Sequence, residues 1–167
     1  MIRGRQQGSE ERLAQLEDDV TGSIGSYGSV GAFDVDEDGR LSPNVPGSRL
    51  GMKFRWRDRV VSTALRTIED GSIGIMTLRT QAGRIPSSAL AAAARPDAFG
   101  LLRTLPALLP SQWTLTIAPD HSVQLEAEMR VPMPALVSDL LVPAVRFCLI
   151  ASPYFDLLEE NAMGLRA

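Results

Sequence analysis

The sequence predicts an α+β protein in which helices pack on one face of an antiparallel sheet. Three observations predict this class. Apolar and polar residues alternate from Met52 to Arg57 and again from Trp113 to Val131, as they do in half-buried strands. From Pro134 to Glu160, apolar residues recur every three or four positions, which is the pattern of a helix. The elements are predicted in the order α-βββ(β)-α-ββ-α.

Residues 1–31 are predicted to form an arm that precedes a single domain over residues 32–167. Ser9 is a suitable N-cap, and Leu13, Leu16 and Val20 follow at helical spacing. Residues 21–31 are rich in Gly and Ser, a composition typical of a connector. We therefore expect a short helix on a loose tether.

The first strands are predicted from alternation and turn residues. Phe33 and Val35 lead to a turn at Asp38-Gly39, and residues 60–68 and 73–80 form a second pair of β-rich segments around Glu69-Asp70-Gly71. After residue 83 the composition turns helical, and Pro96, Pro106 and Pro110 should divide that region into short pieces.

The last two elements are expected to form the main core. The segment from Trp113 to Val131 reads as a hairpin that turns at Pro119-Asp120-His121. In the helix that follows, Pro143 and Pro153 should produce kinks or separate pieces, because each removes a backbone donor. Its apolar stripe is expected to be buried, and it comprises Val137, Leu140, Leu141, Ala144, Val145, Cys148 and Leu149.

Composition limits the function classes. A net charge of -3 argues against a general nucleic-acid binder, which usually has a basic excess. The apolar region from Val131 to Ser152 contains Asp139 and Arg146, so no membrane span is expected. With one cysteine and no secretory signal pattern, the chain is expected to be cytoplasmic and to need no cofactor.

The acidic segment Asp34-Val35-Asp36-Glu37-Asp38-Gly39 contains half of an EF-hand calcium loop. Asp34, Asp36 and Asp38 match the first three ligand positions, but Val45 stands where the loop needs a bidentate Glu. Calcium binding is therefore the weak alternative, and an acidic turn is the favoured interpretation.

No catalytic constellation is predicted. Cys148 lies on the apolar stripe, and the only histidine, His121, lies on a turn, so a Cys-His pair is not expected. Glu126 and Glu128 are expected to pair across the outer face of the sheet with the cations of residues 53–59. In the alternative interpretation, Arg55 and Arg57 with the two glutamates bind an anion or small ligand, or form an enzyme site.

Large aromatic side chains are the candidates for binding a partner. Trp56, Trp113, Tyr154 and Phe155 lie on half-covered strands or near a helix end, where aromatics often anchor interfaces. Core packing is the simpler expectation for each of them.

The layout of residues 32–160 resembles that of type III secretion chaperones and YbjN-type regulators. Ile75-Met76-Thr77-Leu78 through Ile85-Pro86 is similar to the strand and turn before their middle helix, and residues 113–131 and 134–158 look like their terminal hairpin and helix. The resemblance implies a small cytoplasmic homodimer without catalysis that binds another polypeptide. It implies neither a nucleic-acid nor a membrane partner.

Overall fold

The computed structural model describes residues 29–30, 33–45, 47–68, 70–89 and 91–165. The predicted N-terminal helix and connector lie outside these residues, except Ser29 and Val30. The elements in chain order are β1 (Ser29–Val30), β2 (Phe33–Val35), β3 (Arg40–Pro43), β4 (Arg49–Trp56), β5 (Arg59–Ile68), β6 (Ile73–Arg84), η1 (Ala92–Ala94), α2 (Arg95–Thr104), η2 (Leu105–Leu108), β7 (Trp113–Ile117), β8 (Ser122–Pro132), β9 (Ala135–Leu136) and α3 (Val137–Glu160).

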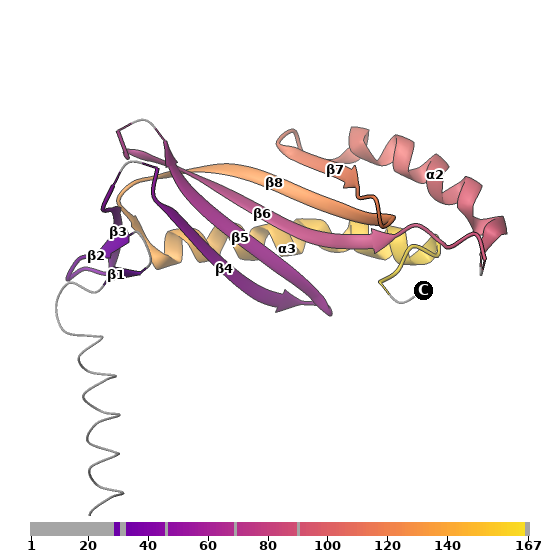
Figure 1. Cartoon of the computed structure of the whole chain (residues 1–167), viewed down its shortest axis with the longest axis horizontal. Helices are drawn as coiled ribbons and strands as arrows, with labels where there is room; N and C mark the ends of the chain where they lie inside the picture. Colours follow the sequence, from indigo (N-terminus) through magenta and orange to yellow (C-terminus); the bar gives the residue numbers. More distant parts are fainter. Residues whose placement is uncertain (1–28, 31–32, 46, 69, 90, 166–167) are drawn as a thin grey trace, which may run out of the picture.

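The main sheet is antiparallel and has five strands in the order β4-β5-β6-β8-β7 (Figure 1). The predicted hairpin of β7 and β8 is confirmed, with Trp113 opposite Ala127 and Ile117 opposite Val123. The β-rich segments on either side of Asp70 pair as β5 and β6, with Ile68 opposite Ile73. Alternation thus predicted β7 and β8 correctly, because one face of the sheet is buried and the other faces solvent. The β-rich composition predicted β5 and β6.

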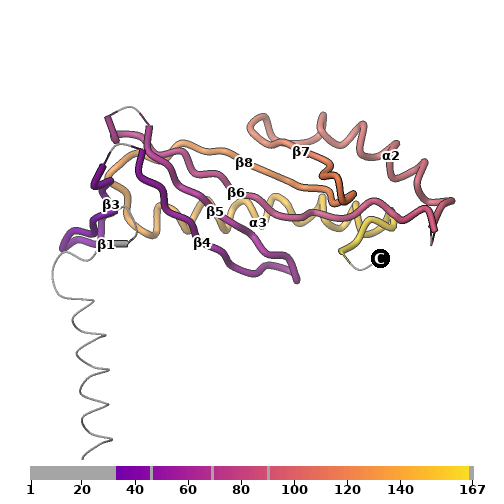
Figure 2. Tube along the Cα trace, viewed as in Figure 1, coloured from indigo at the N-terminus to yellow at the C-terminus, as the bar shows by residue number. Residues whose placement is uncertain are grey.

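The helix α3 lies along the buried face of this sheet, as both the ribbon and the tube show (Figures 1 and 2). Its buried side includes Leu140, Phe147, Cys148 and Phe155, which pack with the inward side chains of β5, β6 and β8. The side chain of Asp139 accepts a hydrogen bond from the Leu136 backbone N–H at 2.9 Å, which caps the first turn.

The prolines were expected to kink α3 or to divide it into pieces, and the division was wrong. The helix continues from Val137 to Glu160 with Pro143 and Pro153 inside it. Near Pro153, the Ser152 hydroxyl donates to the Cys148 carbonyl at 2.9 Å. Packing along the whole buried side keeps the two halves in line, and this tertiary contribution outweighs the local cost of each proline.

The small second sheet is a difference from the single sheet expected. It has the order β1-β2-β3-β9 and lies at the end of the main sheet where α3 begins (Figure 1). The predicted turn at Asp38-Gly39 joins β2 to β3, and β3 pairs with β9 through Leu41 and Ala135. Phe33 and Leu41 are buried, so this sheet extends the core past the start of α3.

The helix α2 and the turn η2 complete the core beside β7. Pro96 stands in the first turn of α2, so it begins the helix and does not break it. Ala98, Leu102 and Leu105 are buried in the same core as α3. The α+β class is therefore confirmed, with helices packed on one face of an antiparallel sheet.

Candidate functional site

The most unusual surface is on α3, where large apolar side chains are exposed. Val142 is 67% exposed, Leu149 59%, Val145 54% and Leu141 51%. Leu141, Val145 and Leu149 belong to the stripe that was expected to be buried, and so does Val137, which is 46% exposed. The expectation was wrong for these four residues. The reason is geometric: apolar residues occupy nearly the whole circumference of the helix, and one sheet covers one side of it.

The exposed stripe faces the side of α3 on which β4 lies. Leu141, Val145 and Leu149 precede Ser152 by 11, 7 and 3 positions, so helical geometry places them on the same side as Ser152. The indole Nε1 of Trp56, at the end of β4, donates to the Ser152 hydroxyl at 3.4 Å.

The inward side chains of β4 extend this apolar area. Leu50, Met52, Phe54 and Trp56 are only half-buried, although they point to the face that α3 covers. The cause is that α3 packs mainly on the middle strands and leaves the β4 margin partly open. We call Leu141, Val145 and Leu149 with these four residues of β4 the α3–β4 surface.

Of the described helices, α3 is long and apolar enough to cross a membrane by length and composition, with a third of its most apolar window buried. The core helix of a soluble protein can meet the same criterion.

Of the four aromatic residues predicted to bind a partner, the structure brings Trp113 and Tyr154 into contact but does not gather all four on one surface. Phe155 is 1% exposed and lies in the core, so it offers no surface. Trp113 packs against Phe147 and Tyr154, with ring centroids 4.7 and 6.5 Å away, and Tyr154 donates to the Leu108 carbonyl. Of the four, Trp56 is the one that belongs to the α3–β4 surface.

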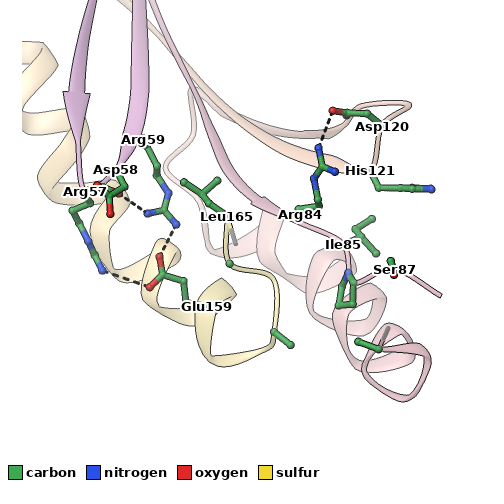
Figure 3. Close-up of a pocket in the computed structure, with 14 residues that line it drawn as sticks. Arg57, Asp58, Arg59, Arg84, Ile85, Ser87, Asp120, His121, Glu159 and Leu165 are labelled. Atoms are coloured by element: carbon green, nitrogen blue, oxygen red, sulfur yellow. Dashed lines mark hydrogen bonds and ion pairs between the residues drawn. The ribbon is translucent and has the colours of Figure 1, made fainter. Parts of the chain in front are cut away.

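A cavity of about 670 Å³ opens at the end of the main sheet where α3 ends (Figure 3). It is formed by the β4–β5 turn, the end of β6, the β7–β8 turn and the residues after α3. Its polar and charged lining consists of Arg57, Asp58, Arg59, Arg84, Ser87, Asp120, His121 and Glu159.

The arginines of this cavity already have carboxylate partners. Arg59 extends to Glu159 at 2.7 Å, and on the opposite side Arg84 reaches Asp120 at 3.5 Å (Figure 3). Arg57 donates to Asp156 at 2.5 Å, and this hydrogen bond raises the pKa of the guanidinium. The charges are thus largely balanced before any ligand enters.

Arg59 is the buried member of this group. It is 3% exposed, its guanidinium lies 4.2 Å from the Phe155 ring centroid, and it donates to the Ala82 carbonyl at 3.1 Å. It therefore ties β5 to β6 and to the end of α3. Arg59 was expected on the outer face of the sheet, and this was wrong. It stands opposite Trp56 across the β4–β5 turn, so its side chain points inward as that of Trp56 does.

The expected pairing of Glu126 and Glu128 with the cations of residues 53–59 was also wrong. Both glutamates lie on β8, three strands from β4. The Nε of Arg79 on β6 donates to the Glu126 carboxylate at 2.6 Å. The residues of the anion-binding alternative are separated as well. Arg57 lines the cavity at the sheet end, whereas Glu126 and Glu128 line a second hollow beside β7, and Arg55 lines neither.

In the acidic segment at residues 34–39, a carboxylate binds backbone N–H groups of the turn. The Asp36 carboxylate accepts hydrogen bonds from the backbone N–H groups of Asp38 at 3.0 Å and Arg40 at 2.8 Å, which is an Asx turn. Among the described residues, no three His, Cys, Asp or Glu side chains come together as a metal site. The structure thus gives Asp34, Asp36 and Asp38 no convergent geometry.

Cys148 and His121 lie in different parts of the fold. Cys148 is buried in α3, and burial raises the pKa of its thiol. His121 is on the β7–β8 turn with a positive φ, and its side chain points away from the pair of Arg59 and Glu159 (Figure 3). Next to it, the Ser122 hydroxyl donates to Asp120 at 2.7 Å and lowers the pKa of that carboxyl.

Cys148 is consequently expected to resist alkylation in the native protein. Because the thiol is buried and its pKa is raised, iodoacetamide at pH 8 should label it at least about a hundredfold more slowly than in the protein unfolded in urea. Mass spectrometry of the intact chain over time measures both rates. Equal rates would show that the packing of α3 against the sheet does not bury this residue.

No family model, no curated protein and no solved structure matches this chain. The fold and its surfaces therefore define the class: an α+β protein in which the described helices leave one sheet face uncovered and a long helix exposes an apolar side.

Sequence reasoning missed both the exposed side of α3 and the cavity. The run Leu140-Leu141-Val142 was a usable signal, because three consecutive apolar residues of a helix cannot all face one sheet. The cavity had no such signal, since its residues come from segments far apart in the chain.

Proposed function

We propose that this chain is a non-catalytic protein-binding module, chaperone-like or regulatory, that acts as a homodimer. The observation that carries the proposal is the exposed apolar side of α3. Four Leu and Val side chains, each more than half exposed, lie within nine residues of one helix. Contiguous apolar surface of this kind usually marks an interaction site.

A second copy of the chain is the occupant that this surface fits. Leu141, Val145 and Leu149 are uncharged and equally spaced, so two such stripes are complementary to each other around a twofold axis. The stripe of a 24-residue helix can align with its symmetry mate without requiring an opposite charge.

The helix rather than the edge of β4 is the contact that we propose. β4 is an edge strand of the main sheet, but Arg49, Lys53 and Arg55 project from its outer face. Charged side chains on an edge strand oppose its pairing with the same strand of another copy. The half-buried residues of β4 would instead enlarge the apolar contact made by α3.

The double substitution Leu141→Gln and Leu149→Gln should convert the dimer to a monomer. Four side chains leave the interface, two from each protomer, at about 1 kcal/mol each for half of a leucine surface. Their loss of about 4 kcal/mol weakens the dimer roughly a thousandfold. Light scattering coupled to size exclusion, over a series of protein concentrations, measures the change.

Leu108→Gln is the matched control, because Leu108 is 62% exposed but lies on η2. This variant should remain dimeric. A monomeric wild type at all concentrations, or a double variant that dimerises as tightly as the wild type, would overturn the proposal.

A small-ligand or enzyme function remains the second candidate, and the cavity at the end of α3 is the observation that favours it. Its volume is suited to a small molecule. Since Arg57, Arg59 and Arg84 are paired with carboxylates, a ligand would have to compete with Asp156, Glu159 and Asp120 for them. For this reason we rank it below protein binding.

A further inference from the structure

The outer face of the main sheet, opposite α3, carries a row of arginines. Strand pairing places Arg49 of β4 opposite Arg66 of β5, Arg66 opposite Ile75 of β6, and Ile75 opposite Arg130 of β8. The three arginines are exposed, whereas Ile75 between them is 8% exposed. Arginine can lay its methylene groups on an apolar neighbour while its charged head stays in water.

These cations are not neutralised within the part of the chain that the structure describes. Its ion pairs involve Arg57, Arg59, Arg79 and Arg84, and none involves a residue of the row. Lys53 and Arg55 of β4, which lie on the same face, are also outside these pairs. Glu126 and Glu128 on β8 are the acids of this face, and Glu126 is held by Arg79.

The direct opposition of Arg49 and Arg66 is unfavourable in itself. Like charges at directly opposite positions of antiparallel strands repel each other. A bound anionic group would remove this repulsion and gain two or three charge-assisted hydrogen bonds, since each guanidinium offers a planar set of donors.

We propose that this outer face, at Arg49, Arg66 and Arg130, binds an acidic polypeptide segment. The site does not depend on the proposed dimer, which uses the opposite side of the molecule. It also differs from the anion site considered from the sequence, because it is centred on the row and not on Arg57.

The size of the basic area fits a short peptide. From β4 to β8 it spans three strand spacings, about 14 Å, and from Arg49 to Lys53 it extends four residues, about 13 Å. Carboxylates on alternate residues of an extended peptide are about 7 Å apart, so two or three of them can lie over the row. A longer polyanion would reach Glu128 and Glu126, whose carboxylates would repel it.

The character of this face favours a peptide over nucleic acid. The described outward residues of β4, β5, β6 and β8 include no aromatic side chain on which a base could stack.

The test is fluorescence anisotropy with a labelled octaglutamate peptide at low salt. Comparison probes are a Gly/Ser peptide of equal length and a single-stranded DNA octamer. The double variant R66Q/R130Q should weaken octaglutamate binding about tenfold, in line with about 0.7 kcal/mol for each exposed contact. The variant R79Q/R103Q is matched in charge but alters an arginine already paired with Glu126 and one on α2, and it should bind within twofold of the wild type.

Thermal unfolding checks that both double variants are folded. The single variant R66Q should be at least as stable as the wild type, because it removes one of the two opposed charges. Equal weakening by both double variants would show non-specific attraction and overturn the proposal. Octaglutamate binding no tighter than that of the Gly/Ser peptide would also overturn it. If the DNA octamer bound more tightly than octaglutamate, the ligand of this face would be a nucleic acid and the proposal would be wrong.

Discussion

Replacing Gly83 with alanine is expected to destabilise the fold by about 3 kcal/mol, as overpacking against fixed backbone does. A β-carbon at this position would lie 2.2 Å from the carbonyl oxygen of Met163. That carbonyl is fixed, because it accepts a hydrogen bond from the Arg84 backbone N–H at 3.1 Å and Met163 itself is fully buried. Urea denaturation followed by circular dichroism measures the loss.

Gly83→Ala should displace the residues that follow α3. The segment from Ala162 to Leu165 must move away from β6, and with it the burial of Met163 and one wall of the cavity would be lost. Hydrogen exchange should therefore increase at Arg84 before it increases in the centre of β6.

Gly100→Ala is the control with the opposite sign. Gly100 lies inside α2, and a β-carbon there meets nothing within 4 Å. Alanine should stabilise the protein by about 0.5–1 kcal/mol, because glycine is the poorer helix former. If Gly83→Ala were as stable as the wild type, the close approach of the C-terminal residues to β6 would be wrong.

Replacing Arg59 with alanine is expected to cost about 2–4 kcal/mol. The change removes three hydrogen bonds, to Arg57, Ala82 and Glu159, together with the contact to the Phe155 ring. It also leaves a cavity at a position that is 3% exposed. Glu159 is 43% exposed on its side chain, so water can solvate it and the cost stays below that of stranding a fully buried charge.

Two further variants separate packing from hydrogen bonding at Arg59. Arg59→Met keeps most of the apolar stem against Phe155 and should recover about half of the loss. Arg55→Ala removes an exposed arginine of β4 that has no ion pair in the described structure, and it should change the unfolding free energy by less than about 0.5 kcal/mol. An Arg59→Ala protein as stable as Arg55→Ala would contradict the role given to Arg59.

Local sequence patterns predicted the elements that depend on one buried face. The alternation of Trp113 to Val131 specified a hairpin, and Asp38-Gly39 specified a turn, because side-chain direction and turn conformation are set within a few residues. The failures share a cause. Pro143 and Pro153 were expected to kink the last helix or divide it into pieces, and packing keeps it continuous. Arg59 was placed on the wrong face because the direction of the strand after the turn was not known.

The sequence by itself determined the α+β class, most of the strands and the apolar character of the last helix, since these follow from periodicity. Tertiary structure alone decided which side of α3 is buried, where the arginines meet and which of them find carboxylates. The physical reason is that one sheet covers about half of a helix and strand register selects neighbours across the sheet. The first of these leaves Leu141 and Leu149 exposed. The second places Arg49 opposite Arg66 and brings Arg59 to Glu159.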